Sequence, residues 1–394
     1  MSKWQTAKLG DICVITSSKR IFAHEYRSDG VPFYRGKEII EKYNGKNVSN
    51  ELFIEEQRFL EISNKHGAPQ QGDLLLTSVG TLGVPYIVEN ERFYFKDGNI
   101  TWFRNFDGAI SKYVYYWLLS PQGRQQIDSK SIGSTQRALT IDSLLGFEMD
   151  LPPIEEQHTI AATLSCLDDK IALNRRINAT LEQMAQAIYS DFVTDIDGTM
   201  MQLKHLCAFQ EGYVNPSQNN PEYFDGEVKW LRAVDINESF IFDTSRTLTN
   251  NGFESAGKSA FLFKPDTVAI SKSGTIGRLG FIADFMCGNR AVINIAPNDT
   301  RILPFIYLYL KSRQPEFFDL AVGSVQKNLY VPILQELEIT VPQESKLYGF
   351  CDTVSPLFNK WKNNVKENNI LIATRDALLP RLMSGNYLHP NDDE

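Results

Sequence analysis

A stretch of twenty residues occurs twice in this chain, and the repeat limits the folds that the sequence can adopt. Residues 133–152 read GSTQRALTIDSLLGFEMDLP and residues 323–342 read GSVQKNLYVPILQELEITVP, with seven identical positions and no gap. Three further pairs of segments recur in the same order: 31–36 with 228–233, 72–83 with 265–277, and 113–118 with 305–310. A solenoid repeats every 20–50 residues or so. The much longer spacing here therefore indicates one domain plan used twice.

Each copy of the repeated stretch leads into a segment with helical periodicity. Apolar residues recur at steps of three and four over 160–192 and again over 350–382, which is the heptad pattern of a coiled coil. Both seams carry two asparagines near their centres: Asn174 and Asn178 in the first, Asn364 and Asn368 in the second. A buried asparagine in such a seam costs stability but fixes the register of the pair.

The direction of the two helices decides which asparagines meet. Antiparallel pairing within one chain brings Asn174 to Asn368 and Asn178 to Asn364, whereas parallel pairing matches Asn174 with Asn364. We favour the antiparallel arrangement, because each helix begins where its own globular unit ends, and the units then lie at opposite ends of a rod. Asparagines that face solvent on an ordinary helix surface are the remaining alternative.

Two prolines bear on the limits of the second helix. Pro356 follows Ser355, a good N-cap residue, and is one candidate for the first residue of the regular helix. Pro380 is expected to end or kink it. A helix of about 30–40 residues spans about 45–60 Å, at ~1.5 Å per residue.

These patterns predict an α+β fold with pseudo-twofold symmetry. The chain of 394 residues exceeds what a single core usually holds. We expect two similar β-rich heads joined by two long helices that form an intramolecular antiparallel coiled coil. The expected limits are heads at 1–152 and 197–342, helices at 153–196 and 343–387, and a tail at 388–394.

Composition restricts the compartment and the mode of binding. The chain has no run of 18 apolar residues and no apolar segment typical of a signal peptide near its start, and its five cysteines are scattered without metal-ligand spacing. We therefore expect a cytoplasmic protein without a membrane partner, whose thiols are reduced and mostly buried. The net charge is −8, and no segment is strongly basic. Any contact with nucleic acid must then come from local clusters of basic residues or from partner subunits.

Four short motifs occur in combination. They are WQTAKLGDI at 4–12, the Gly-Ser-x-Gln of both repeated stretches, LPPIEEQ at 151–157, and LPRLMSG at 379–385. Together they resemble the specificity (S) subunit of type I restriction-modification systems. The resemblance covers essentially the whole chain, and the combination is more specific than any single motif.

The resemblance implies a function and a set of partners. Two target recognition domains would each read one half of a bipartite, asymmetric sequence in double-stranded DNA. The coiled coil would space them and dock two modification (methyltransferase) subunits, with restriction subunits joining that core. The chain would be non-catalytic and bind no cofactor, so that S-adenosylmethionine, ATP and Mg²⁺ belong to the partner subunits.

The residues agree with a non-catalytic subunit. An adenine methyltransferase needs an Asn/Asp-Pro-Pro-aromatic motif, and the nearest candidate, residues 150–154, has an intervening leucine and lacks the aromatic. Asp266 is not followed by the Glu-x-Lys of a nuclease, and the chain carries no Walker A pattern. Two alternatives stay open: an unrecognised DNA-modifying enzyme, and a structural coiled-coil adaptor whose heads bind protein.

Some candidate DNA contacts are shared by the two heads. They are Arg35 with its neighbour Lys37, and Arg232; Ser78, Thr81, Lys272, Thr275 and Arg278 in two Gly-rich turns; and Gln136, Arg137, Gln326 and Lys327. Arginine binds guanine bidentately, and glycine-rich turns allow a backbone to approach phosphate closely. The alternatives are structural: an ion pair of the scaffold for the arginines, a β-turn common to both heads, and a loop hydrogen bond for the glutamines.

Residues that read bases should lie where the heads differ. These candidates are Lys19, Arg20, Lys65, His66, Asn289, Arg290 and the loop 215–220. A solvated surface is the alternative for Lys19, Arg20 and Lys65. The histidines have no catalytic or metal-binding constellation around them, so neither a catalytic residue nor a metal site is expected.

Overall fold

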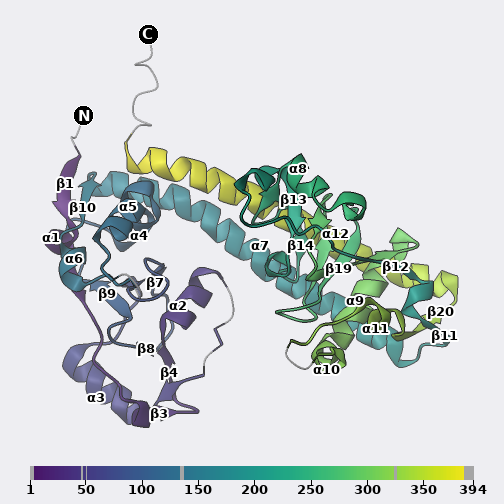
Figure 1. Cartoon of the computed structure of the whole chain (residues 1–394). Coiled ribbons are helices and arrows are strands. Elements are labelled where there is room, and N and C mark those ends of the chain that lie inside the picture. Colours follow the sequence, from purple (N-terminus) through teal and green to yellow (C-terminus); the bar gives the residue numbers. More distant parts are fainter. Residues whose placement is uncertain (1–3, 46–47, 50, 134–136, 324–325, 386–394) are drawn as a thin grey trace. The chain divides into compact units, whose positions relative to one another are not determined.

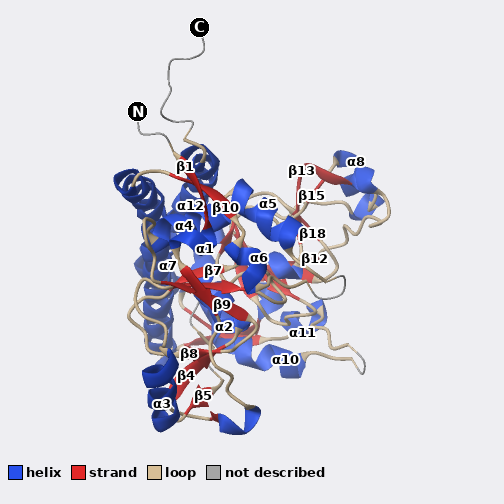
Figure 2. Ribbon diagram, turned by 90° about the vertical axis from the view of Figure 1, so that its left-hand side faces the viewer, coloured by secondary structure: helices blue, strands red, loops and turns tan. Residues whose placement is uncertain are grey.

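The structure is a computed structural model that describes residues 4–45, 48–49, 51–133, 137–323 and 326–385. The chain divides into two compact units, the first formed by residues up to Ala172 together with those from Ile370 onward, and the second by Leu173–Asn369. Two long helices, α7 (Ile154–Thr194) and α12 (Glu344–Met383), contribute to both units (Figure 1). Helices and short strands are mixed throughout (Figure 2), which confirms the predicted α+β class.

The first unit is built from short strands and short helices. Its strands are β1 (Gln5–Lys8), β2 (Val14–Thr16), β3 (Tyr26–Arg27), β4 (Val31–Tyr34), β5 (Phe53–Ile54), β6 (Leu74–Thr77), β7 (Pro85–Ile87), β8 (Tyr94–Phe95), β9 (Ile100–Arg104) and β10 (Glu148–Leu151). Its shorter helices are α1 (Leu9–Ile12), α2 (Gly36–Tyr43), α3 (Glu56–His66), α4 (Ser111–Leu119), α5 (Pro121–Lys130) and α6 (Ile141–Leu145). The strands form sheets in the orders β2-β9-β6-β7, β3-β5-β4-β8 and β1-β10.

The second unit uses the same kinds of element. Its strands are β11 (Gly198–Gln202), β12 (Cys207–Glu211), β13 (Phe224–Leu231), β14 (Phe240–Ile241), β15 (Thr247–Leu248), β16 (Thr267–Ser271), β17 (Leu279–Ile282), β18 (Cys287–Gly288), β19 (Val292–Pro297) and β20 (Glu338–Pro342). Its shorter helices are α8 (Asn250–Glu254), α9 (Leu303–Arg313), α10 (Phe317–Leu320) and α11 (Val331–Gln335). The sheet orders are β12-β19-β16-β17-β14, β15-β13-β18 and β11-β20.

The strand order shows that one plan is used twice. The order β2-β9-β6-β7 of the first unit returns as β12-β19-β16-β17, and β5-β4-β8 returns as β15-β13-β18. The repeated stretch forms α6 and β10 in one unit and α11 and β20 in the other. In each unit its strand pairs antiparallel with the first strand of that unit, β1 or β11. The internal repeat in the sequence is therefore also a repeat of strand topology.

The long helices are part of each hydrophobic core. In the first unit, Leu164 of α7 and Leu379 of α12 belong to the cluster around Phe103 and Trp117. In the second, aromatic side chains of α12 join those of the sheet, and the ring centroids of Phe281 and Phe358 lie 5.3 Å apart in an edge-on arrangement. Burial at about 25 cal/mol per Å² of apolar area holds the helices in place more strongly than their intrinsic propensity does.

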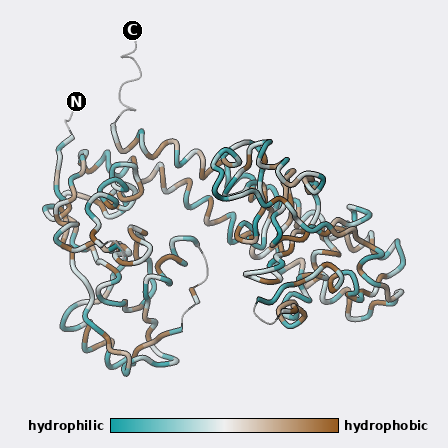
Figure 3. Tube along the Cα trace, viewed as in Figure 1, coloured by the Kyte–Doolittle hydropathy of each residue, from teal (hydrophilic) through white to brown (hydrophobic). Residues whose placement is uncertain are grey.

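The asparagine layers show the direction of the helices. Asn174 Nδ2 donates to Asn368 Oδ1 at 2.9 Å, and Asn364 Nδ2 donates to Asn178 Oδ1 at 2.8 Å. All four side chains are buried. Hydrophobic (brown) residues recur among hydrophilic (teal) ones along both helices (Figure 3). The predicted antiparallel arrangement is confirmed, because a later residue of α7 faces an earlier residue of α12.

Pro356 does not begin the second helix, which starts instead within one residue of the expected limit at 343. Helix α12 begins at Glu344 and continues through Pro356. Proline inside a helix removes one hydrogen bond and costs about 3 kcal/mol. Val354 and Phe358, on either side of it, are buried in the core of the second unit, so their packing offsets that cost. Pro380 lies in the last turn, and the helix ends three residues later at Met383.

Candidate nucleic-acid interface

Each unit contains a pair of parallel strands at an equivalent place in its topology, and the candidate residues gather where that pair ends. In the first unit β4 runs parallel to β8, with Tyr34 opposite Phe95, and the backbone N–H of Lys96 donates to Tyr34 O at 2.8 Å. In the second unit β13 runs parallel to β18, and the N–H of Asn289 donates to Leu231 O at 3.0 Å. We call these two places the carboxyl edges of the units.

The carboxyl edge of the first unit brings together residues that are distant in sequence. Arg35 follows β4, and Lys96 with Asp97 follows β8. The loop after β2 reaches the same place, because Lys19 N donates to Tyr94 Oη at 2.9 Å and Arg20 Nε lies 2.9 Å from Asp97 Oδ2.

His66, at the end of α3, belongs to the same region. Burial first, and then the positive charges of Lys19 and Lys65, lower the pKa of His66 below its ordinary value. Lys19 and Lys65 therefore act on one imidazole, although 46 positions separate them in the sequence. The structure brings together three candidates that the sequence could only name separately.

The carboxyl edge of the second unit also collects several candidates. Arg232 follows β13, and Asn289 with Arg290 follows β18. The loop 215–220 begins beside them, because Trp230 Nε1 donates to Val214 O at 2.8 Å. The exposed Arg290 thus lies in the same neighbourhood as Arg232 and the loop.

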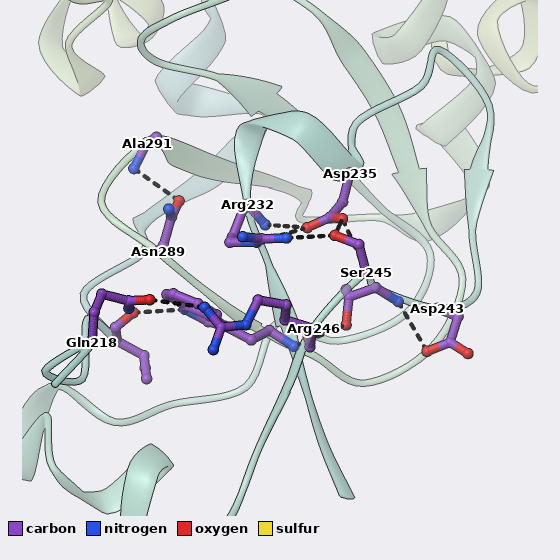
Figure 4. A network of polar contacts seen from close by, with 11 residues as sticks. Gln218, Arg232, Asp235, Asp243, Ser245, Arg246, Asn289 and Ala291 are labelled. Carbon is purple, nitrogen blue, oxygen red and sulfur yellow. Dashed lines mark hydrogen bonds and ion pairs between the residues drawn. The ribbon is translucent and has the colours of Figure 1, made fainter. Parts of the chain in front are cut away.

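The arginine that the two units share has a scaffold role in both. Arg35 N donates to Glu38 Oε2 at 2.7 Å and its Nη2 donates to Glu38 Oε1 at 2.7 Å. Arg232 N donates to Asp235 Oδ2 at 2.9 Å, and its Nε lies 3.6 Å from the same oxygen (Figure 4). In each unit the carboxylate three residues later binds both the backbone and the side chain of the arginine. The geometry therefore favours the structural alternative for Arg35 and Arg232, an ion pair of the scaffold.

A second contact to these arginines differs between the units. Arg35 Nη2 lies 3.1 Å from Glu51 Oε2, and Lys37 Nζ lies 2.8 Å from Glu51 Oε1. In the second unit, Arg232 Nη2 donates instead to the hydroxyl of Ser245 at 2.5 Å. Glu51 thus brings a negative charge to Arg35 and Lys37 at the first carboxyl edge. At the second edge the equivalent contact to Arg232 is the uncharged hydroxyl of Ser245.

The two Gly-rich turns share one pattern of internal hydrogen bonds. Thr77 Oγ1 donates to Thr81 O and accepts from Val84 N; Ser271 Oγ donates to Thr275 O and accepts from Arg278 N. The side chains of Thr81 and Thr275 remain exposed. The matching bonds show that the turns have a structural role.

Other members of the turns are tied to the protein. Ser78, expected as a DNA contact, is only 2% exposed, and its hydroxyl donates to Leu76 O, so it has no open face for a nucleic acid. Lys272 is ion-paired with Glu211. Arg278 Nη1 donates to Ile236 O at 3.2 Å.

The loops of the repeated stretch hold the remaining candidates. Gln136 lies outside the described residues. Arg137 is ion-paired with Asp128 at 3.0 Å, Gln326 is exposed, and Lys327 Nζ donates to Phe318 O at 3.3 Å. Arg137 and Lys327 thus reach neighbouring parts of their own units.

Arg246 is a member of the second edge that the sequence did not single out. It directly precedes β15, and its Nη1 donates to Gln218 Oε1 at 2.8 Å (Figure 4). Among the described residues, no carboxylate lies within ion-pair distance of Arg246, Arg290, Lys19 or Lys65. These four cations, like Lys96 of the first edge, have no ion pair within the described residues that would compete with a phosphate or a base edge.

The described part of the chain offers little for other chemistry. None of its helices is long and apolar enough to cross a bilayer. Over the same residues, no three His, Cys, Asp or Glu side chains gather as they would around a metal ion.

Comparison with known proteins places the chain in a family. A sequence model described as the type I restriction modification DNA specificity domain matches residues 1–183 and again 196–368. The type I restriction enzyme HindI specificity subunit of Haemophilus influenzae is 24% identical over 475 residues, covering 98% of this chain and 100% of the relative. The MjaIX specificity subunit of Methanocaldococcus jannaschii is 25% identical over 414 residues, covering 97% and 93%.

A solved structure agrees on the fold. The S subunit of a type I restriction-modification system from M. genitalium superposes with a TM-score of 0.59 at 16% identity, covering 96% of both chains. Because the domain model covers most of the chain in two successive copies, the chain belongs to the family of type I restriction modification DNA specificity domains.

Proposed function

We propose that this chain is the DNA sequence-specificity subunit of a type I restriction-modification complex. Each unit reads one half of a bipartite, asymmetric site in double-stranded DNA, and its carboxyl edge faces the DNA. The recognition domains correspond to residues 1–152 and 197–342. The related proteins from Haemophilus influenzae and Methanocaldococcus jannaschii are named specificity subunits of restriction enzymes, which supports this assignment.

One observation carries the proposal: the two edges have the same frame but different side chains. The parallel strand pair, the shared arginine and its carboxylate recur in both units. The residues around them do not recur, since Lys19, Arg20 and Lys65 surround one edge and Arg246, Asn289 and Arg290 the other. A common frame with different polar side chains suits two different half-sites, because base edges are read by side-chain hydrogen bonds.

The partners are also part of the proposal. The coiled coil of α7 and α12 sets the spacing between half-sites and docks two modification (methyltransferase) subunits, which restriction subunits then join. The internal repeat supports this arrangement, because two identical subunits can then bind equivalent surfaces. The chain itself is non-catalytic and acts in the cytoplasm. S-adenosylmethionine, ATP and Mg²⁺ bind to the partner subunits.

Methylation mapping of the reconstituted complex tests the proposal. We expect methylated sites that share two short defined sequences separated by a spacer of fixed length. Exchange of residues 1–152 for the corresponding domain of a relative should change one half of that sequence and leave the other half intact. A change in both halves would refute independent reading.

Two outcomes favour the alternative functions. Methylation of DNA by the purified chain alone would identify an enzyme. A complex that methylates DNA without any sequence preference would identify a structural adaptor. The isolated chain with S-adenosylmethionine is therefore the control for every mapping experiment.

A further inference from the structure

The two units differ at the position just before β5 and β15. Phe33 N donates to Leu52 O at 2.9 Å in the first unit, and Trp230 N donates to Arg246 O at 3.4 Å in the second. These are equivalent bonds, because β5 and β15 pair antiparallel with the equivalent strands β4 and β13. Arg246 therefore stands in the second unit where Leu52 stands in the first.

The residue before it also changes. Glu51 contacts the shared arginine of the first unit, and Ser245 contacts that of the second. The first unit thus has Glu-Leu where the second has Ser-Arg, a formal change of two positive charges at one place in a common frame. A residue that differs between the units at a matched position is a candidate for reading a different half-site.

The side chain of Arg246 is fixed before any ligand arrives. Its Cζ lies 4.0 Å from the ring centroid of Phe224, a stacking distance. The Phe224 ring lies 6.0 Å from that of Trp230, and Arg232 covers the Trp230 ring at 5.4 Å. The two arginines therefore flank a pair of packed aromatic rings.

Hydrogen bonds hold both ends of Arg246. Its carbonyl accepts from Thr244 Oγ1 at 2.8 Å as well as from Trp230 N. At the other end, Gln218 Oε1 accepts from Nη1, and the side chain of Gln218 in turn donates to Pro216 O at 3.3 Å. With Nη1 engaged, Nη2 and Nε of the guanidinium have no partner among the described residues.

We propose that Arg246 reads a guanine in the half-site that the second unit recognises, with Gln218 as its positioning residue. This inference rests on the proposed DNA-reading function. The two free donors match O6 and N7 of guanine, the commonest specific contact between arginine and a base pair. Stacking and the glutamine remove much of the rotamer entropy that an exposed arginine otherwise loses on binding. No carboxylate competes for the guanidinium within the described residues, in contrast to Arg35.

The test uses the complex reconstituted with modification subunits, and methylation mapping of Arg246→Ala and Arg246→Lys. We expect both variants to relax one guanine position in one half-site, with a loss of discrimination of roughly 5- to 150-fold, and to leave the other half-site unchanged. Arg246→Lys keeps the charge but not the two-pronged donor pattern. Gln218→Ala should relax the same position to a smaller extent.

Arg301 provides a matched control in the same unit. Its Cζ also lies 4.0 Å from an aromatic centroid, that of Tyr348, but it is ion-paired with Asp299 at 2.9 Å. Arg301→Ala should leave the recognised sequence unchanged.

Other outcomes would overturn the inference. If the variant binds all DNA sequences more weakly by the same factor, and the slope of log affinity against log salt concentration falls by about one, Arg246 contacts a phosphate instead. Full wild-type specificity in Arg246→Ala would exclude guanine reading by this side chain. If the wild-type complex shows no bipartite preference, the proposed function fails first, so the two failures are distinguishable.

Discussion

Asn174 of α7 donates a hydrogen bond of 2.9 Å to Asn368 of α12, which lies 194 positions later in the chain. Both side chains are buried in the seam between the helices. Asn174 Nδ2 also donates to Glu367 Oε2 at 2.7 Å. The pair fixes which residues of the two helices face each other, because an amide displaced into an apolar layer would lose these bonds.

Asn174→Leu should destabilise the chain, because it leaves the amide of Asn368 without this partner. The expected loss in the free energy of unfolding is about 1–3 kcal/mol. The double variant Asn174→Leu with Asn368→Leu should recover most of that loss, since an apolar pair needs no hydrogen bond. Urea unfolding of the isolated chain followed by circular dichroism gives all three free energies. A double variant as unstable as the single one would contradict the predicted recovery.

Asp168 should stabilise the first unit more than any exposed ion pair on α12. It accepts from Tyr116 Oη at 2.7 Å and from Arg375 Nη1 at 2.7 Å. Burial and then the charge of Asp168 raise the pKa of Tyr116 above its ordinary value. We expect Asp168→Ala to lower the free energy of unfolding by about 1.5–3 kcal/mol, as for hydrogen bonds to charged groups.

Asp376 is the control for that prediction. It is also ion-paired with Arg375, at 2.8 Å, but its side chain is 58% exposed. Asp376→Ala should cost no more than about 1 kcal/mol. Equal losses for the two variants in the same urea experiment would contradict a special role of Asp168.

Glu38→Gln should destabilise the first unit without a large change of shape. Glu38 is fully buried and accepts hydrogen bonds from both the backbone and the guanidinium of Arg35. The amide brings an N–H donor to Arg35, which needs acceptors, so a loss of about 1.5–3 kcal/mol is expected. Lys37→Gln breaks only an exposed pair with Glu51 and should change stability by less than about 1 kcal/mol. Thermal unfolding of the two variants beside wild type compares them directly.

The sequence was sufficient for the fold because the fold depends on periodic patterns. Every residue predicted for the two heptad seams, from Ile160 to Phe192 and from Phe350 to Leu382, is buried or half-buried. The asparagine pairs followed from the same register. The continuation of α12 through Pro356 could not be predicted in this way, because the signal of Pro356 is local and the packing of Val354 and Phe358 is not.

The candidate site was less accessible to sequence analysis. Lys19 and Lys65 could be named from their charge, but only the structure shows that both act on His66. Arg246 was missed because residues 245–248 share no identity with residues 51–54, and their equivalence is visible only in the backbone hydrogen bonds. Ser78 was named because it lies in a repeated turn, and its burial depends on contacts with Leu76 and Thr101.

The five cysteines should differ sharply in reactivity. Burial raises the pKa of Cys13, Cys207 and Cys287 to about 12 and that of Cys351 to about 11, whereas Cys166 of α7 is exposed. A raised pKa lowers the fraction of reactive thiolate at pH 8, and burial also blocks access. We expect iodoacetamide to label Cys166 alone in the folded chain at pH 8 and all five cysteines in denaturant. Peptide mass spectrometry identifies the sites; rapid labelling of a second cysteine in the folded chain would contradict the predicted burial.

Insertion of one heptad into both long helices should lengthen the spacer of the recognised site. The pairs Asn174–Asn368 and Asn178–Asn364 fix the register, and positions after Ala172 and after Asn369 then face each other. Seven residues at both positions lengthen the coiled coil by about 10 Å, at ~1.5 Å per residue. Because both helices gain the same number of residues, the residues that face each other elsewhere along the seam stay the same. That length corresponds to about three base pairs at ~3.4 Å each, so methylation mapping should give the same two half-sites with a spacer about three base pairs longer.

A heptad in α7 alone has no counterpart in α12 and should reduce methylation without producing a new, uniform spacer. An unchanged spacer in the double insertion would show that the coiled coil does not set the distance between half-sites.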